Sequence, residues 1–139
     1  MLIIFLVFTL VGCDQSIGQS QNQSGENQTE ADSYLLSPDD FEKAYKEKEG
    51  AKLLDIRTNM EVKNGYIEGM EQVDWFRGDF KSIVENKFDK NDPLFVYCGI
   101  GGRSQGCVDM LKQAGYKEVY ELRGGMKGWE KANKPIKKS

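Results

Sequence analysis

Short apolar segments alternate with helix-like segments from Tyr34 to the end of this 139-residue chain, and this alternation constrains the fold more than any other feature. The segments that we expect to form strands are residues 51–56, 71–74, 94–97 and 119–122. Between them, apolar residues recur at helical spacing, which predicts helices from Pro38 toward Gly50, over 58–64, around Phe80 to Phe88, over 103–114 and around Trp129. Strands that alternate with helices indicate an α/β fold, with a parallel β-sheet flanked by helices on both faces.

Capping residues support two of these helices. Ser37 can accept a hydrogen bond from the first turn of a helix in which Pro38 suits the first position. Thr58 begins a short helix that Gly65 ends, because glycine commonly follows the last helical turn.

The first 12 residues form an apolar, uncharged segment that is too short to span a bilayer, for which about 20 residues are needed. The sequence Leu-Val-Gly-Cys13 at its end resembles the bacterial lipoprotein signal. This resemblance implies that residues 1–12 are a signal peptide and that Cys13 is lipidated and becomes the new N-terminus. Two points oppose it: no basic residue precedes the apolar run, and the segment can instead be read as a buried element with a free Cys13.

Residues 14–33 are rich in Gln, Asn, Ser and Gly and carry four acidic and no basic side chains. Such a segment buries too little apolar surface to offset its ordering entropy, so we expect a disordered polar tether. With the lipidated Cys13 that the signal resemblance implies, this part of the chain is residues 13–33. The domain then comprises residues 34–139, with all 19 Lys and Arg and a net charge of +1. This balance gives no reason to expect a nucleic-acid partner.

The chain contains no histidine, which excludes Ser-His-Asp and Cys-His catalysis. Its three cysteines are too few for a four-thiolate zinc site, so no metal is expected. Any catalysis must therefore depend on Cys, Asp, Glu, Lys or Arg side chains or on backbone amides.

The segment Cys98–Ser104 is the candidate active site. Cys98 follows the most apolar strand, three glycines follow within four residues, and a helix is expected from Arg103. Glycines let successive N–H groups turn toward one anion, and the helix N-terminus and Arg103 add positive charge. A thiol in this cradle has a lowered pKa and is largely thiolate, the nucleophilic form. The alternative is a structural buried cysteine before an ordinary glycine turn.

Five motifs in order resemble those of the rhodanese family of sulfurtransferases. The motifs are Asp55-Ile-Arg57 with Glu61, Gly65-Tyr66-Ile67-x-Gly69, Asp74-Trp75, the Cys98–Ser104 loop (similar to C-x-x-G-x-R-S), and Val119-Tyr-x-Leu-x-Gly124-Gly125 followed by Trp129. The resemblance covers residues 34–139 and implies a single rhodanese-like domain. Tyr66 stands where the family usually has histidine and Met70 where it has a small residue, for which we expect altered packing.

The resemblance implies a sulfurtransferase that moves sulfane sulfur from thiosulfate or a persulfide donor to a thiol or other thiophilic acceptor. Cys98 would carry the sulfur as a persulfide, without a cofactor. The residues expected to contact substrate are Gly99, Ile100, Gly101, Gly102, Arg103, Ser104 and Arg57. With the lipid anchor on Cys13, we expect a monomer at the bacterial cell envelope, held on a membrane.

Several individual roles stay open at this point. Arg103 either orients the anion and closes the loop or forms a salt bridge at the helix start. Arg57 either lines the cleft or pairs with Glu61, four residues on, and we expect a structural role for Asp55. Cys107 falls on the inward side of its helix, which favours burial over a resolving role.

Two other functions compete with sulfur transfer. Related phosphatases use C-x5-R, but only four residues separate Cys98 from Arg103, and Ser104 occupies the position that a phosphatase needs for arginine. The domain can also be a non-catalytic binding or redox-sensing module, in which Cys98 and Cys107 form a switch.

Overall fold

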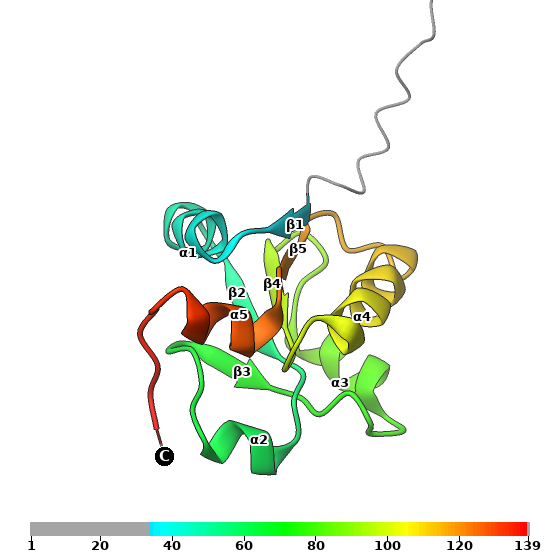
Figure 1. The fold of residues 1–139 in the computed structure, drawn as a ribbon. Helices are drawn as coiled ribbons and strands as arrows, with labels where there is room; N and C mark the ends of the chain where they lie inside the picture. The colour runs from blue at the N-terminus through cyan, green and yellow to red at the C-terminus, as the bar shows by residue number, and fades with distance from the viewer. Residues whose placement is uncertain (1–33, 139) are drawn as a thin grey trace, which may run out of the picture.

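The computed structural model describes residues 34–138, in which a five-stranded parallel sheet lies between helices (Figure 1). The strands are β1 (Leu35–Leu36), β2 (Lys52–Asp55), β3 (Met70–Gln72), β4 (Leu94–Tyr97) and β5 (Val119–Leu122). The helices are α1 (Pro38–Glu47), α2 (Asn59–Lys63), α3 (Phe80–Lys87), α4 (Gly102–Gln113) and α5 (Gly125–Lys131). The predicted α/β fold with a parallel, two-sided sheet is confirmed.

Strand β4 lies at the centre of the sheet, whose order is β1-β5-β4-β2-β3. All neighbouring strands run parallel. Every residue of β4 is buried, because both of its faces are covered and both of its edges are paired. The apolar character that predicted this strand therefore reflects complete burial on two faces.

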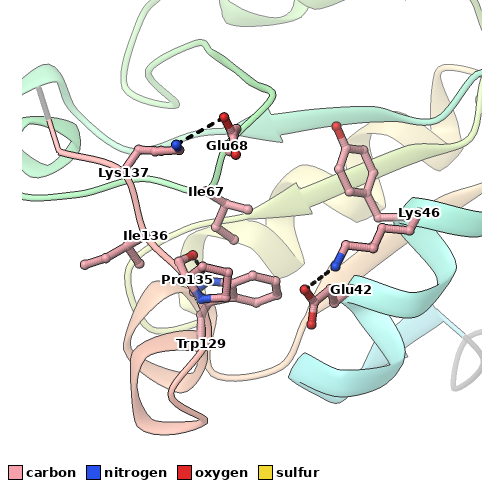
Figure 2. Close-up of a pocket in the computed structure, with 9 residues that line it drawn as sticks. Glu42, Lys46, Ile67, Glu68, Trp129, Pro135, Ile136 and Lys137 are labelled. Carbon is pink, nitrogen blue, oxygen red and sulfur yellow. Dashed lines mark hydrogen bonds and ion pairs between the residues drawn. The ribbon is translucent and has the colours of Figure 1, made fainter.

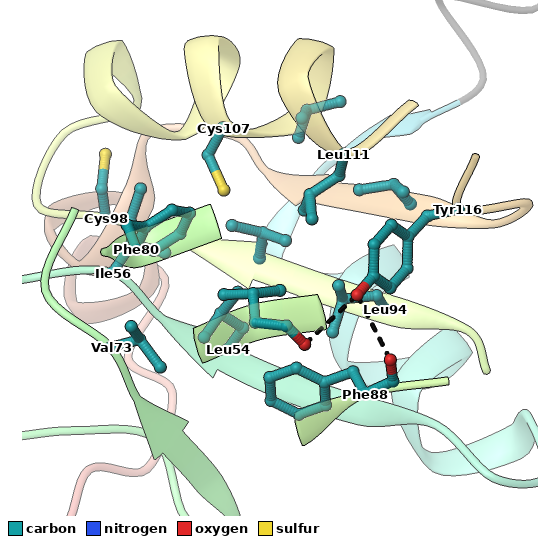
Figure 3. Close-up of a cluster of buried hydrophobic side chains, with 14 residues drawn as sticks. Leu54, Ile56, Val73, Phe80, Phe88, Leu94, Cys98, Cys107, Leu111 and Tyr116 are labelled. Atoms are coloured by element: carbon teal, nitrogen blue, oxygen red, sulfur yellow. Dashed lines mark hydrogen bonds between the residues drawn. The ribbon is translucent and has the colours of Figure 1, made fainter. Parts of the chain in front are cut away.

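One apolar cluster fills the space between the sheet and helices α3 and α4 (Figure 3). Leu54 and Val96 contribute to it from the sheet, and Val84 and Leu111 contribute from the helices. Tyr116 closes one end of the cluster, where its hydroxyl donates to the carbonyl oxygen of Val84 or Phe88, each at 3.2 Å.

A second cluster, rich in aromatic rings, packs helices α1 and α5 against the opposite face. Phe95 lies at its centre, with the rings of Phe41, Tyr45 and Tyr120 at centroid distances of 5.2, 5.6 and 4.7 Å. Trp129 is 3% exposed, and its indole N–H donates to the Pro135 carbonyl at 2.9 Å. The tail after α5 is thereby held against the domain.

The predicted Ser37 cap is confirmed, and Thr58, predicted as the first residue of its helix, is the N-cap of α2. The Ser37 hydroxyl accepts a hydrogen bond from the Asp40 amide at 3.2 Å, at the start of α1. At α2, Thr58 and Glu61 form a capping box, in which each side chain accepts from the other's backbone amide.

Two strands differ from the sequence-based expectation. We did not predict β1, because its two residues are too few to show a periodic pattern, and it forms only by pairing with β5 at the sheet edge. Strand β3 begins at Met70 and ends at Gln72, whereas we predicted residues 71–74. Val73 and Trp75 still bond to β2 and to Ile56 through their backbone amides, so the segment continues along the sheet beyond its last paired residue.

The predicted signal peptide (1–12), Cys13 and the predicted tether (13–33) lie outside the described residues. Within residues 34–138, no helix has the length and apolar composition that crossing a membrane requires.

Candidate active site

Three strand-to-helix loops meet at one edge of the sheet. They connect β2 to α2, β4 to α4 and β5 to α5. Because the strands are parallel, the carboxyl ends of β2, β4 and β5 share this edge, and Cys98 directly follows β4 in the middle. The fold therefore surrounds Cys98 with backbone and side chains from the other two loops.

The Cys98 sulfur lies in a cradle of hydrogen-bond donors at the start of α4. The Gly101 amide donates to Sγ at 3.1 Å, and Gly101 has a φ of 106°, a conformation that favours glycine. Burial raises the pKa of the Cys98 thiol, but hydrogen bonds from Ser104 and from the Gly101 and Ile100 amides outweigh it and lower that pKa overall. The lowered pKa favours the nucleophilic thiolate.

Helix α5 holds the Cys98 loop from the other side. The Met126 amide donates to the Cys98 carbonyl at 2.8 Å, and the Lys127 amide donates to the Gly99 carbonyl at 3.0 Å. Gly125 makes this approach possible: its φ is +56°, and a Cβ placed there would lie 2.5 Å from the Cys98 carbonyl oxygen. The Gly124-Gly125 pair singled out in the sequence thus allows two backbone segments to touch.

Arg103 pairs with Glu61 of α2. Its two terminal nitrogens lie 2.9 and 2.5 Å from the carboxylate oxygens, and the guanidinium also lies 5.7 Å from the centre of the Phe76 ring. The pair lies against Gly99, where an added Cβ would be 3.0 Å from the guanidinium and 3.2 Å from the carboxylate. Arg103 therefore closes the loop against α2 through an ion pair across the site, not through a local pair at its own helix start.

Arg57 is turned away from the loop. Its guanidinium binds the Asp55 carboxylate, with a shortest contact of 2.6 Å, and donates to the Gly65 carbonyl at 2.9 Å. The predicted alternative of an Arg57–Glu61 ion pair is wrong, because the Glu61 carboxylate is bound by Arg103. Arg57 is 4% exposed, so substrate contact stays a prediction that this arrangement does not favour, whereas the structural role expected for Asp55 agrees with it.

The remaining loop residues divide between surface and interior. Ile100 is 73% exposed and Gly102, the first residue of α4, is also exposed. Ser104 is fully buried, and its Oγ lies 3.4 Å from the Cys98 sulfur and 2.6 Å from Oε1 of Glu121. Sequence reasoning did not single out Glu121, although a charged residue inside a strand expected to be buried was a usable signal.

Cys107 belongs to the apolar core, as predicted. It is fully buried beneath α4, and burial raises the pKa of its thiol, so the thiol stays protonated. Both described cysteines are free, and Figure 3 shows their sulfur atoms pointing in different directions. The two thiols therefore lie in different surroundings, Cys98 among hydrogen-bond donors and Cys107 beneath α4 with a raised pKa.

A pocket of about 220 Å³ lies away from Cys98, between α1, α5 and the C-terminal tail (Figure 2). It is lined by Glu42, Tyr45, Lys46, Ile67, Glu68, Trp129, Pro135, Ile136 and Lys137. None of these residues belongs to the Cys98 loop, so this pocket is separate from the cradle of amides around the Cys98 sulfur.

Residues 37–132 match the sequence profile of the family described as "Rhodanese-like domain". The chain therefore belongs to the rhodanese-like domain family, which confirms the resemblance seen in its motifs.

Two curated relatives illustrate the range of proteins that contain a similar sequence. Thiosulfate sulfurtransferase GlpE of Pseudoalteromonas translucida is 31% identical over 86 residues, which cover 62% of this chain and 79% of that protein. tRNA uridine(34) hydroxylase of Protochlamydia amoebophila is 32% identical over 123 residues, which cover 84% of this chain but only 35% of that protein. The chain thus spans about a third of the hydroxylase and most of the sulfurtransferase.

Solved structures give the same fold. The chain is similar to a rhodanese-like domain protein from Staphylococcus aureus, with a TM-score of 0.60 and 26% identity, over 68% of this chain and 89% of that one.

We expect Gly125→Ala to disturb the site, because the new Cβ collides with the Cys98 carbonyl and a positive φ is strained for alanine. The free energy of unfolding should fall by at least about 2 kcal/mol, which lowers Tm by roughly 10 °C. Alkylation of Cys98 should also slow. Thermal unfolding and alkylation kinetics measure both. Gly106→Ala, in α4 where an added Cβ makes only an ordinary 3.6 Å contact, is the matched control. A variant at Gly125 with unchanged Tm and alkylation rate would show that the close approach is not required.

We expect Glu61→Gln to lower stability near neutral pH by about 1 kcal/mol or less, since the Arg103 pair is partly exposed. The hydrogen bond from Arg103 is the largest contribution that lowers the pKa of Glu61, to about 2. A lowered carboxyl pKa contributes stability that is present above the ordinary value near 4.5 and lost as the pH falls through about 2. The difference in Tm between wild type and variant should therefore shrink toward pH 2.

Glu47→Gln is the control for this measurement, because Glu47 is exposed on α1 and joins no ion pair among residues 34–138. A Tm difference for Glu61→Gln that does not change with pH would contradict the ion-pair explanation.

Proposed function

We propose that this domain is a sulfurtransferase that carries sulfane sulfur on Cys98 as a persulfide. One observation supports this most directly: the Cys98 sulfur is held by backbone amides at the start of α4, where its pKa is lowered without an imidazole. A persulfide anion, like a thiolate, is stabilised by such a cradle of N–H donors.

The reaction has two half-reactions of the ping-pong type. In the first, the Cys98 thiolate attacks the sulfane sulfur of the donor. A new S–S bond forms to Cys98, the donor's S–S bond breaks, and the leaving group departs with the bonding electrons. For thiosulfate that group is sulfite, and for a persulfide it is the donor thiolate.

In the second half-reaction, an acceptor thiolate attacks the outer sulfur of the Cys98 persulfide. The acceptor becomes a persulfide, and the Cys98 thiolate is regenerated with the bonding electron pair. No oxidant or reductant is consumed in either half-reaction.

The comparisons support sulfur transfer over the alternatives. The relative from Pseudoalteromonas translucida is named a thiosulfate sulfurtransferase, and the chain spans most of its length. A phosphatase would need arginine where Ser104 stands, and Ser104 is buried against Cys98. In a Cys98–Cys107 redox switch, the two sulfur atoms, which point in different directions in Figure 3, would have to turn toward each other.

We expect the purified protein to gain the mass of one sulfur atom when it is given thiosulfate or glutathione persulfide. Cys98→Ser should abolish the gain, and Cys107→Ala should retain it, because Cys107 is fully buried under α4 and its thiol stays protonated. Intact-mass spectrometry measures both. An unchanged wild-type mass with every sulfane donor would contradict the catalytic function. The reversible loss of two hydrogen masses, requiring both cysteines, would favour the redox switch instead.

We also propose that the chain acts at the bacterial cell envelope, anchored through a lipid on Cys13. Support comes from the sequence alone: an apolar, uncharged segment ends in Leu-Val-Gly-Cys13, and a polar segment separates it from the domain. Acyl chains would then attach the protein to a membrane without a spanning helix.

Radiolabelled palmitate should enter the full-length protein when it is expressed in bacteria, and Cys13→Ala should abolish labelling. Cys98→Ser is the control, since a thioester on the active-site thiol would be lost in that variant. Label that persists in Cys13→Ala would rule out this anchor.

A further inference from the structure

Glu121 is a carboxylate placed inside the fold without a cationic partner. It lies on β5 opposite Val96 of β4, and its side chain faces α4, with 8% of the residue exposed. None of the ion pairs of residues 34–138 includes it. Lys112 of α4 acts on the pKa of Glu121 as a nearby charge but forms no ion pair with it, and its ammonium lies 4.1 Å from the centre of the Tyr34 ring. A buried charge without a cation is costly, so Glu121 requires an explanation.

The contact that Glu121 does make leads to the nucleophile. Its Oε1 lies 2.6 Å from the Ser104 hydroxyl, and that hydroxyl oxygen lies 3.4 Å from the Cys98 sulfur. Ser104 and Cys98 are both fully buried. A continuous chain of hydrogen-bonding atoms thus runs from the reactive thiol through one hydroxyl to one carboxyl group.

Counting hydrogens shows how the three groups depend on one another. The Ser104 hydroxyl has one hydrogen and three possible acceptors: the Glu121 carboxylate, the Cys98 sulfur, and the Gly101 carbonyl at 3.0 Å. An ionised Glu121 takes that hydrogen, which leaves a Ser104 lone pair facing a protonated Cys98 thiol. A protonated Glu121 donates to Ser104 instead, which frees the hydroxyl hydrogen to bind the Cys98 thiolate.

We propose that Glu121 accepts the proton of Cys98 through Ser104, and so acts as a positioning residue in place of the histidine that this chain lacks. The Cys98 S–H bond breaks as a bond to Ser104 Oγ forms, and the Ser104 O–H bond breaks as a bond to Glu121 forms. One buried negative charge is present before and after the transfer. The transfer itself therefore adds no second charge to the buried site, which a dry interior would disfavour.

The proposal rests on the proposed function only in that the thiolate is the form that takes sulfur. Burial raises the pKa of Glu121 more than the Ser104 hydrogen bond lowers it, and the pKa of Cys98 is lowered. These shifts bring the proton affinities of the two groups closer together. The other titratable or charged groups that face the pair are Cys107, Asp109 and Lys112 of α4 around Glu121, and Arg103 with Glu61 around Cys98.

The test measures the rate of Cys98 alkylation against pH in the full-length protein, read at Cys98 by peptide mass spectrometry with iodoacetamide. We expect two steps in the wild type. In the lower step Cys98 and Glu121 together lose one proton, so that the thiolate is present in part. In the upper step they lose the second proton, and the thiolate is fully formed. A single step in the wild type would overturn the proposal.

Two variants separate a shared proton from a merely structural role. Glu121→Gln removes the buried charge that opposes ionisation of the thiol. We therefore expect one step, with its midpoint about one pH unit below the upper step of the wild type. Ser104→Ala keeps the charge but removes the hydroxyl, so the lower step disappears and the upper step moves to higher pH. If either variant changes Tm but reproduces the wild-type profile, the relay is excluded.

Glu118→Gln is the matched control, because Glu118 directly precedes β5 and its carboxylate is bound by Lys48 and Tyr120, each at 2.7 Å, and not by Ser104. It should keep both steps. Alkylation needs no sulfur donor, so its outcome is independent of the persulfide measurement. If the protein takes up no sulfur but its alkylation profile shows two steps, the proposed function is contradicted and the relay is supported.

Discussion

The contact between the Cys98 loop and the start of α5 is the constraint on which the site depends. The Cys98 carbonyl accepts from the Met126 amide, and Gly125 lies so close to that carbonyl that no larger residue fits without movement. Because its carbonyl is fixed from one side, the chain after Cys98 curls to the other, where the Gly101 amide meets the sulfur at 3.1 Å. A glycine 27 positions along the chain from Cys98 thus helps to aim the donors that lower the pKa of the thiol.

The arginine side chains near Cys98 are engaged with carboxylates of the protein itself. Both arginines that the sequence suggested are already paired: Arg103 with Glu61 and Arg57 with Asp55. The positive potential at the sulfur therefore comes mainly from N–H groups and the N-terminus of α4, which are fixed dipoles and need no reorganisation when charge develops. Arg103 lies near enough to Cys98 to add to it, but its shortest contacts are with Glu61.

Much of this arrangement could be predicted from the sequence, and the exceptions have physical reasons. The buried strand before Cys98, the glycine-rich turn and the Ser37 cap are local features, and local features leave local signals. The partners of Arg57 and Glu61 could not be read this way. Their spacing of four suits a helical pair, but Arg57 lies before α2 begins, beside Asp55 at the end of β2. Strand β1 also left no signal, since two residues have no period.

Glu121 is a different kind of omission, because its signal was present in the sequence. A glutamate between Tyr120 and Leu122, in a strand expected to be covered on both faces, is a local inconsistency, and such inconsistencies often mark functional positions. Only the structure shows that the carboxyl group meets Ser104 and not a lysine.

The direction of β1 has a consequence for how the domain presents itself. Since β1 runs parallel to β5 and β4, the polypeptide enters β1 from the side of the sheet on which the strands begin, whereas Cys98 follows the end of β4 (Figure 1). An attachment through the chain that precedes Tyr34 would therefore act on that side of the domain, and the exposed part of the Cys98 loop, at Ile100, would stay open to solvent.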